Sequence, residues 1–187
     1  MLWHKLIGFA ILSLVLTQLE LVQSDVPASG CRNNFSLAAG KCLLVTNSYY
    51  NWYEADRHCR SLGAGLLSIQ NQTQLQQIEQ WIAVKAPWVL DFWTSGNSLG
   101  QTGAYYWQST GELARYLPWS PSQPQTKNGD CLVLESNKYS TAGYSDFRLS
   151  NKNCTHFGPH ICEQQQQKYN TRICLKPGSY ENAQVLA

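Results

Sequence analysis

The sequence predicts an α+β domain stabilised by disulfides, and three observations support this prediction. Two segments in the first half of the chain have the apolar spacing and the polar cap residues of helices. From residue 87 onward the pattern changes to short aromatic strands separated by glycine and serine turns. Seven cysteines occur in 187 residues, a density typical of a disulfide framework in an oxidising compartment. We therefore expect two helices, short antiparallel sheets and a long loop region.

The two predicted helices each begin after an asparagine. The side chain of Asn51 can accept hydrogen bonds from free backbone amides, and Glu54, three residues later, can reach back. The residues that share the buried face of this helix are Trp52, Ala55 and Cys59. The second helix, over 73–82, repeats the capping pattern with Asn71 and Gln74. Its apolar stripe consists of Leu75, Ile78 and Ile82.

The strands are predicted from short apolar runs. Before the first helix, Cys31 and Cys42 enclose a segment with Gly40, which predicts a hairpin followed by a strand at 43–45. The later strands are predicted at 92–94, 105–107 and 132–134. Prolines at positions 118, 121 and 124 exclude regular structure from most of the segment 117–130. We therefore predict a long loop there.

The two ends of the chain differ from its middle. Residues 1–24 have a weakly basic start, an apolar core and small residues before a cleavage point, which predicts a secretory signal. The apolar run is too short to span a bilayer, so we expect a secreted, extracellular domain over 25–163 with no membrane insertion. Residues 164–187 are polar and are predicted to be a flexible tail. A net charge of +2 gives no basic footprint for nucleic acid.

Several separated motifs together resemble the C-type lectin domain, most closely in the style of the secreted lectins of insects. The matching residues are Asn51-Trp52, Ala55, Cys59, 92–96, Tyr106-Trp107, 110–112, Trp119, Gln123-Pro124, Cys131, Cys154 and 161–163. The spacing of the cysteines alone leaves their connectivity open. The resemblance implies three disulfides: Cys31 with Cys42, Cys59 with Cys162, and Cys131 with Cys154. It also implies a recognition protein that binds glycans or an extracellular glycoprotein.

The residues that hold calcium in sugar-binding members of this family are replaced here. The resemblance places their Glu-Pro-Asn or Gln-Pro-Asp triplet at Gln123-Pro124-Gln125, where the proline is commonly cis. It places a glutamate ligand at Gly129 and an Asn-Asp pair at Ser150 and Asn151. Calcium affinity depends largely on the charge of its oxygen ligands, and no carboxylate occupies these positions. We therefore expect no cofactor and, at most, very weak calcium binding.

Recognition is then expected to use neutral polar groups. The predicted ligand-binding residues are Gln123, Gln125, Ser150 and Asn151. Gln123 keeps the glutamine that accompanies galactose preference in the family, and Asp130 and Asp146 are the nearest carboxylates that could replace the missing ones. Trp119 and Tyr116 either stack on a sugar or belong to the core. The leading hypothesis is a carbohydrate-binding lectin of galactose type, and the alternative is a calcium-independent module that binds a protein ligand.

Other constellations have structural interpretations. Cys154, His156, His160 and Cys162 have a zinc-like spacing, but both cysteines have disulfide partners by the resemblance. No nucleophile stands beside an interpretable base and acid, so we predict that the protein is not an enzyme. Cys174 lies in the tail and is either unpaired or forms a disulfide between two chains. The predicted glycosylation sites are Asn34 and Asn71, and the sequon at Asn153 adjoins a cysteine.

Overall fold

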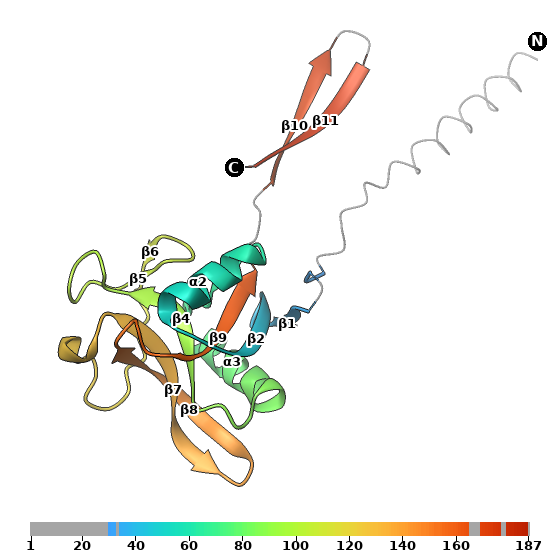
Figure 1. Ribbon diagram of the computed structural model, residues 1–187. Helices are drawn as coiled ribbons and strands as arrows, with labels where there is room; N and C mark the ends of the chain where they lie inside the picture. Colours follow the sequence, from blue (N-terminus) through green and yellow to red (C-terminus); the bar gives the residue numbers. More distant parts are fainter. Residues whose placement is uncertain (1–29, 33, 165–168, 177–178, 187) are drawn as a thin grey trace, which may run out of the picture. The chain divides into compact units, whose positions relative to one another are not determined.

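The computed structural model describes residues 30–32, 34–164, 169–176 and 179–186 (Figure 1). Its main unit is a nine-stranded sheet with two helices, which confirms the α+β prediction. The helices are α2 (Trp52–Ser61) and α3 (Gln72–Lys85), and a 3-10 turn forms η1 (Thr126–Asn128). The strands of this sheet are β1 (Ser36–Ala38), β2 (Lys41–Tyr50), β3 (Ala64–Leu66), β4 (Asp91–Asn97), β5 (Tyr106–Trp107), β6 (Glu112–Leu113), β7 (Cys131–Ser140), β8 (Gly143–Lys152) and β9 (Gly158–Gln164).

Strand β9 lies at the centre of the sheet, because it pairs with β2, β3 and β4. The order across the sheet is β1-β2-β9-β4-β5-β6, and the β7–β8 hairpin is attached to β4 through β7. Figure 1 shows this hairpin projecting as a long twisted ribbon. Strands β3, β6, β8 and β9 were not predicted. Strands β3 and β6 are two or three residues long and lack the aromatic pair that predicted β5. Strands β8 and β9 contain polar residues and glycine, and β9 also contains proline, which are typical of loops.

The capping asparagines start both helices as predicted. Asn51 and Glu54 exchange both hydrogen bonds of a capping box, at 3.0 and 3.1 Å between donor and acceptor. The Asn71 side chain caps α3 by accepting from the Gln74 amide at 2.9 Å. The predicted return contact is wrong, because the Gln74 side chain accepts instead from the Gln70 amide at 2.8 Å. The predicted buried faces are confirmed, and α3 adds Trp81 to its own.

Three disulfides connect the unit, with the pairing that the resemblance implied. Cys59 on α2 is joined to Cys162 on β9 across a sequence separation of 103 residues. Cys131 at the start of β7 is joined to Cys154, just before β9. A third bond joins Cys31 and Cys42 beside the first hairpin. Helix α2 and the central strand are therefore tied together covalently.

The buried side chains form two clusters. The larger one packs α3 against the sheet and includes Leu75, Ile78, Ile82, Phe92, Trp107, Leu132, Leu134, Phe147, Leu149 and Ile161. The smaller one surrounds two of the disulfides and includes Trp52, Ala55, Leu66, Trp93 and Val133. Strand β8 contributes Phe147 and Leu149 to the larger cluster, and its partly buried Tyr144 packs against it.

Glu163 follows the framework cysteine on β9 and has a structural role. Its Oε2 atom accepts from Lys41 Nζ at 2.7 Å, from the Ser68 amide at 2.9 Å and from the Ser68 hydroxyl at 2.9 Å. Burial is the main cause that lowers the pKa of Lys41, and the nearby Glu163 carboxylate acts against it. A buried carboxylate with three donors is satisfied, so Glu163 stabilises the junction of β2, β9 and the segment after β3.

The structure describes only part of the two ends of the chain. The predicted secretory signal lies outside the described residues. In the tail, the sequence predicted no regular structure, whereas β10 (Tyr169–Lys176) and β11 (Ser179–Leu186) pair as an antiparallel hairpin. Cys174 lies on β10 opposite Glu181, and its side chain is outside the described part of the structure. None of the helices in the described ranges has the length and apolar character needed to cross a membrane.

Candidate functional site

The predicted loop region, residues 117–130, joins β6 to β7 and is irregular apart from η1. Two backbone hydrogen bonds hold its first part against β8. The Ser120 amide donates to the Leu149 carbonyl at 2.9 Å, and the Leu149 amide donates to the Pro118 carbonyl at 2.8 Å. The Gln123–Pro124 peptide bond is cis, in agreement with the resemblance. The loop region therefore sits beside the end of β8 that carries Ser150 and Asn151.

Asn151 is the centre of a buried hydrogen-bond network. Asn151 is only 4% exposed. The amide nitrogen donates to the Tyr105 hydroxyl at 2.7 Å and to the Gly129 carbonyl at 3.1 Å. The amide oxygen accepts from the Gln125 backbone amide at 3.1 Å. One asparagine thus connects β8, the loop region and the segment before β5, and its polar atoms are used inside the protein.

The two glutamines of the triplet are also engaged internally. Gln123 Oε1 accepts from the backbone amides of Gln125 at 3.0 Å and Asn151 at 3.3 Å. Gln125 Nε2 donates to the Ser122 carbonyl at 3.0 Å. Both glutamine residues are half-buried, whereas their neighbours Ser122 and Pro124 are exposed. The structure therefore brings Gln123, Gln125 and Asn151 together, but as a network that shapes the loop.

Ser150 and the two aromatic candidates have positions that are largely internal. Ser150 is 3% exposed and pairs with Val133 of β7, so a ligand at the surface does not reach its side chain. Trp119 is half-buried and meets the ring of Tyr105 edge-on, with centroids 5.1 Å apart. Tyr116 is half-buried and donates its hydroxyl to Gln72 Oε1 at 2.5 Å. Trp119 and Tyr116 pack against the larger core cluster, which favours the structural interpretation of both.

Gly129, where the resemblance places a calcium-binding glutamate, has a backbone that excludes any side chain. Its φ is +130°, a conformation that favours glycine. A Cβ atom built there would lie 2.4 Å from the Lys152 carbonyl oxygen and 2.6 Å from the Asn153 amide nitrogen. The close approach of the loop to the end of β8 therefore replaces the side chain that would hold an ion.

The residues at this position do not fit a calcium ion. Calcium takes six to eight oxygen ligands, and its affinity depends on their charge. Here Gln123 and Asn151 already use their side-chain oxygens for backbone amides, and Gly129 has no side chain. The two carboxylates considered as replacements are engaged elsewhere: Asp130 accepts from the Ser98 hydroxyl at 2.9 Å, and Asp146 pairs with Arg148 at 2.9 Å.

Comparison with known proteins identifies the family. The family model of the lectin C-type domain matches residues 48–164, more than half of the chain. The chain belongs to the C-type lectin family. The C-type lectin 37Da of Drosophila melanogaster is 30% identical to it over 140 residues, which cover 67% of this chain and 73% of that protein. The insect-like character of this C-type lectin is therefore confirmed.

Solved structures show the same fold. Human lithostathine aligns with this C-type lectin at a TM-score of 0.65 and 19% identity, over 78% of this chain and 99% of that one. A calcium-independent type II antifreeze protein aligns at a TM-score of 0.57 and 19% identity, over 72% of this chain and 93% of that one. At these identities the likeness establishes the fold and leaves the ligand open.

Two histidines of the C-type lectin domain form a pair that the sequence did not reveal. His58 Nδ1 lies 2.9 Å from His160 Nε2, and His160 is fully buried. Burial and, second, the adjacent His58 lower the pKa of His160 to about 4, so its ring is neutral at neutral pH. The sulfur atom of Cys162 lies within 4.8 Å of this pair, but it is disulfide-bonded. The zinc-like run beginning at Cys154 likewise offers no free thiolate.

The predicted glycosylation sites of this C-type lectin lie at the surface. Asn34 and Asn71 are both exposed, and so is Asn153. Asn71 uses its side-chain oxygen as a helix cap, which leaves its nitrogen, the atom that carries a glycan, without a role in that bond. Glycosylation at Asn34 and Asn71 remains a prediction.

The sequence did not predict one surface feature of this C-type lectin. A hollow of about 320 Å³ lies beside the carboxyl end of α3 and is lined by Tyr49 and Trp88 among others. Trp88 is 60% exposed and Tyr49 is 67% exposed. In the sequence, Trp88 beside Pro87 looks the same whether the tryptophan is buried in the core or exposed at a binding surface. Exposure, which requires the fold, separates the two interpretations.

Replacement of Asn151 by alanine tests the internal network. We expect the free energy of unfolding to fall by about 2–3 kcal/mol, because the Tyr105 hydroxyl, the Gly129 carbonyl and the Gln125 amide lose a buried partner together. Equilibrium unfolding in urea measures this loss. Asn128→Ala, in the exposed η1 turn, is the matched control and should change stability by less than about 0.5 kcal/mol. Equal effects of the two variants would contradict the network.

Proposed function

We propose that this C-type lectin recognises carbohydrate without calcium, through the exposed polar edge of the loop region. The observation that carries this proposal is the Asn151 network, which fixes the loop by hydrogen bonds at the place where family members with calcium use an ion. A loop that is ordered before a ligand binds loses less conformational entropy on binding. A metal is therefore not needed to shape the surface.

The polar groups available to a ligand are the side chains of the loop region that are exposed to solvent. Ser122, Thr126 and Asn128 are exposed, and Gln125 is half-buried between them. Hydroxyl and amide groups form direct hydrogen bonds with sugar hydroxyls, and both types donate and accept. We assign Gln123, Asn151 and the buried Ser150 to supporting this edge. The galactose preference that Gln123 suggests belongs to the same proposal.

A glycan array with the whole secreted chain, in buffer with calcium and in buffer with EGTA, tests the proposal. We expect the same glycans to be bound in both buffers, because hydrogen bonds within the protein hold the loop in place. Calorimetric titration with calcium should give a dissociation constant in the millimolar range or weaker, since carboxylate ligands are missing. Binding that EGTA abolishes, or a micromolar constant for calcium, would contradict calcium independence.

A second candidate function, recognition of a protein ligand, is supported by an exposed apolar strand pair. Tyr106 on β5 and Leu113 on β6 face each other in register and are 42% and 48% exposed. Exposed apolar side chains that lie side by side favour a protein contact more than a sugar contact. An array with no bound glycan in either buffer would select this alternative.

We also propose that the protein is extracellular. The support is the signal-like segment 1–24 in the sequence together with three disulfides, which form and persist in oxidising compartments. A disulfide-linked dimer through Cys174 is part of this proposal. Electrophoresis of the secreted protein with and without reductant, compared with Cys174→Ser, measures it directly.

A further inference from the structure

The hollow beside the carboxyl end of α3 has a structural cause in strand β2. The pairing of β2 with β9 passes from Thr46 opposite His160 to Tyr50 opposite Gly158, so three residues of β2 face one residue of β9. That residue is Pro159, which has no amide hydrogen to donate to the ladder. The resulting bulge contains Asn47 and Tyr49. Bulges redirect side chains, and here both of these residues line the hollow.

The inner side of the bulge is held in place by His160. The Thr46 hydroxyl lies 2.9 Å from His160 Nδ1, and His160 is fully buried. Its second neighbour is His58, at 2.9 Å between ring nitrogens. The buried side chain of His160 therefore supports β2 next to the bulge.

The opposite wall, which carries Trp88, is also fixed. The Pro87 carbonyl accepts from the Tyr144 amide of β8 at 2.8 Å, and the Leu90 carbonyl accepts from the Ser136 amide of β7 at 2.9 Å. Gly143 permits this contact, because a Cβ atom there would lie 2.3 Å from the Pro87 carbonyl oxygen. Hydrogen bonds on both sides of Trp88 thus hold its backbone against the β7–β8 hairpin.

The chemistry of the lining suits a sugar ring. The rings of Trp88 and Tyr49 are exposed, and an aromatic face offers apolar area to the carbon-bound hydrogens of a pyranose. Asn47 and Lys85 add polar groups that hydrogen-bond hydroxyls, and no carboxylate lines the hollow. A volume of about 320 Å³ lies at the small end of the range of ligand pockets, which suits one or two rings better than a folded partner.

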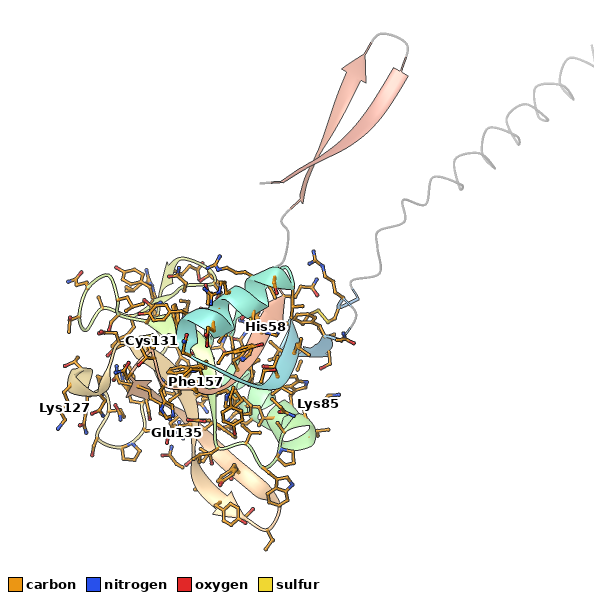
Figure 2. All side chains as sticks on the ribbon, viewed as in Figure 1. His58, Lys85, Lys127, Cys131, Glu135 and Phe157 are labelled. Atoms are coloured by element: carbon orange, nitrogen blue, oxygen red, sulfur yellow. A yellow bond between two sulfur atoms is a disulfide. The ribbon has the colours of Figure 1, made fainter. Side chains whose placement is uncertain are left out.

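We propose that this hollow is a second carbohydrate site, in which a pyranose unit of a glycan stacks on Trp88 and Tyr49. The bulge and the exposed rings support the position of this site, whereas its class of ligand rests on the proposed function. Figure 2 shows Lys85, at the hollow, and Lys127, in the loop region, on opposite sides of the domain. The two sites are therefore separate and can be tested one at a time.

Tryptophan fluorescence of the full chain in EGTA tests the proposal, with galactose, mannose and N-acetylglucosamine as the probes. Trp88 is the most exposed tryptophan among the described residues, so a sugar that covers it should shift the emission to shorter wavelength. We expect Trp88→Ala to remove this shift, and Tyr49→Ala to weaken binding about tenfold. Tyr53→Ala, another exposed aromatic outside the hollow, is the matched control and should leave binding unchanged.

The outcomes separate this site from the loop region. Sugar binding that both Trp88→Ala and Tyr49→Ala leave intact, but that Gln125→Ala weakens, would overturn the second site and leave the proposed function standing. A wild-type protein that binds none of the three sugars and no arrayed glycan would overturn both. An emission shift caused only by a peptide would also overturn the proposal, in favour of a protein ligand. Circular dichroism of each variant shows that the fold is retained.

Discussion

Replacement of Cys59 and Cys162 together by alanine should lower the free energy of unfolding by about 5 kcal/mol. The chain-entropy model gives about this value for a disulfide that closes roughly a hundred residues. The observed separation is 103 residues, and both cysteines are fully buried. The bond also joins α2 to the central strand β9, so its loss loosens the contact between a helix and the middle of the sheet.

The Cys31–Cys42 disulfide is the matched control for this prediction, because it closes a much shorter loop. The Cys31–Cys42 bond closes a separation of only 11 residues, for which the same model gives about 3 kcal/mol. Urea unfolding of both double variants, each in a Cys174→Ser background that prevents thiol exchange, should therefore show a difference of about 2 kcal/mol. If the Cys59/Cys162 variant is no less stable than the Cys31/Cys42 variant, the long loop does not control stability.

Replacement of Gly129 by alanine should lower the free energy of unfolding by about 3–5 kcal/mol. The added Cβ atom would lie 2.4–2.6 Å from backbone atoms of Lys152 and Asn153, and backbone atoms cannot turn aside as a flexible side chain can. The φ of +130° adds strain for any residue other than glycine. Either the loop moves away from β8, which breaks the Asn151 contact to the Gly129 carbonyl, or the overlap remains.

Two other glycines separate the clash from the strain. Gly103 has a positive φ of 82° with nothing near its Cβ position, so Gly103→Ala should cost about 1 kcal/mol. Gly100 has neither a positive φ nor a close neighbour, so Gly100→Ala should be nearly neutral. Thermal and urea unfolding of the three variants measure the series. A Gly129→Ala effect no larger than that of Gly103→Ala would mean that the loop does not pack closely against β8.

The helices and the central disulfides could be predicted from the sequence, because their signals are local or follow a family pattern. Asn51 and Glu54 lie three residues apart, and this spacing predicted the capping box that forms. The same reasoning failed for Gln74, because a competing backbone amide at Gln70 was within reach. Strand β8 escaped prediction because its pairing partner β7, rather than its own pattern, makes it a strand.

The sequence by itself determined that no carboxylate stands at the family's calcium positions, because charge is a property of residue type. Only the tertiary structure decided that Asn151 is buried at these positions, where it holds the loop region through hydrogen bonds with Gln125 and Gly129 and reaches Tyr105 with a third. It likewise decided that Trp88 is exposed and lies at the same hollow as Tyr49, because β2 and the segment after α3 meet there only in the folded chain. Burial and contact between distant segments depend on packing, and local spacing does not encode them.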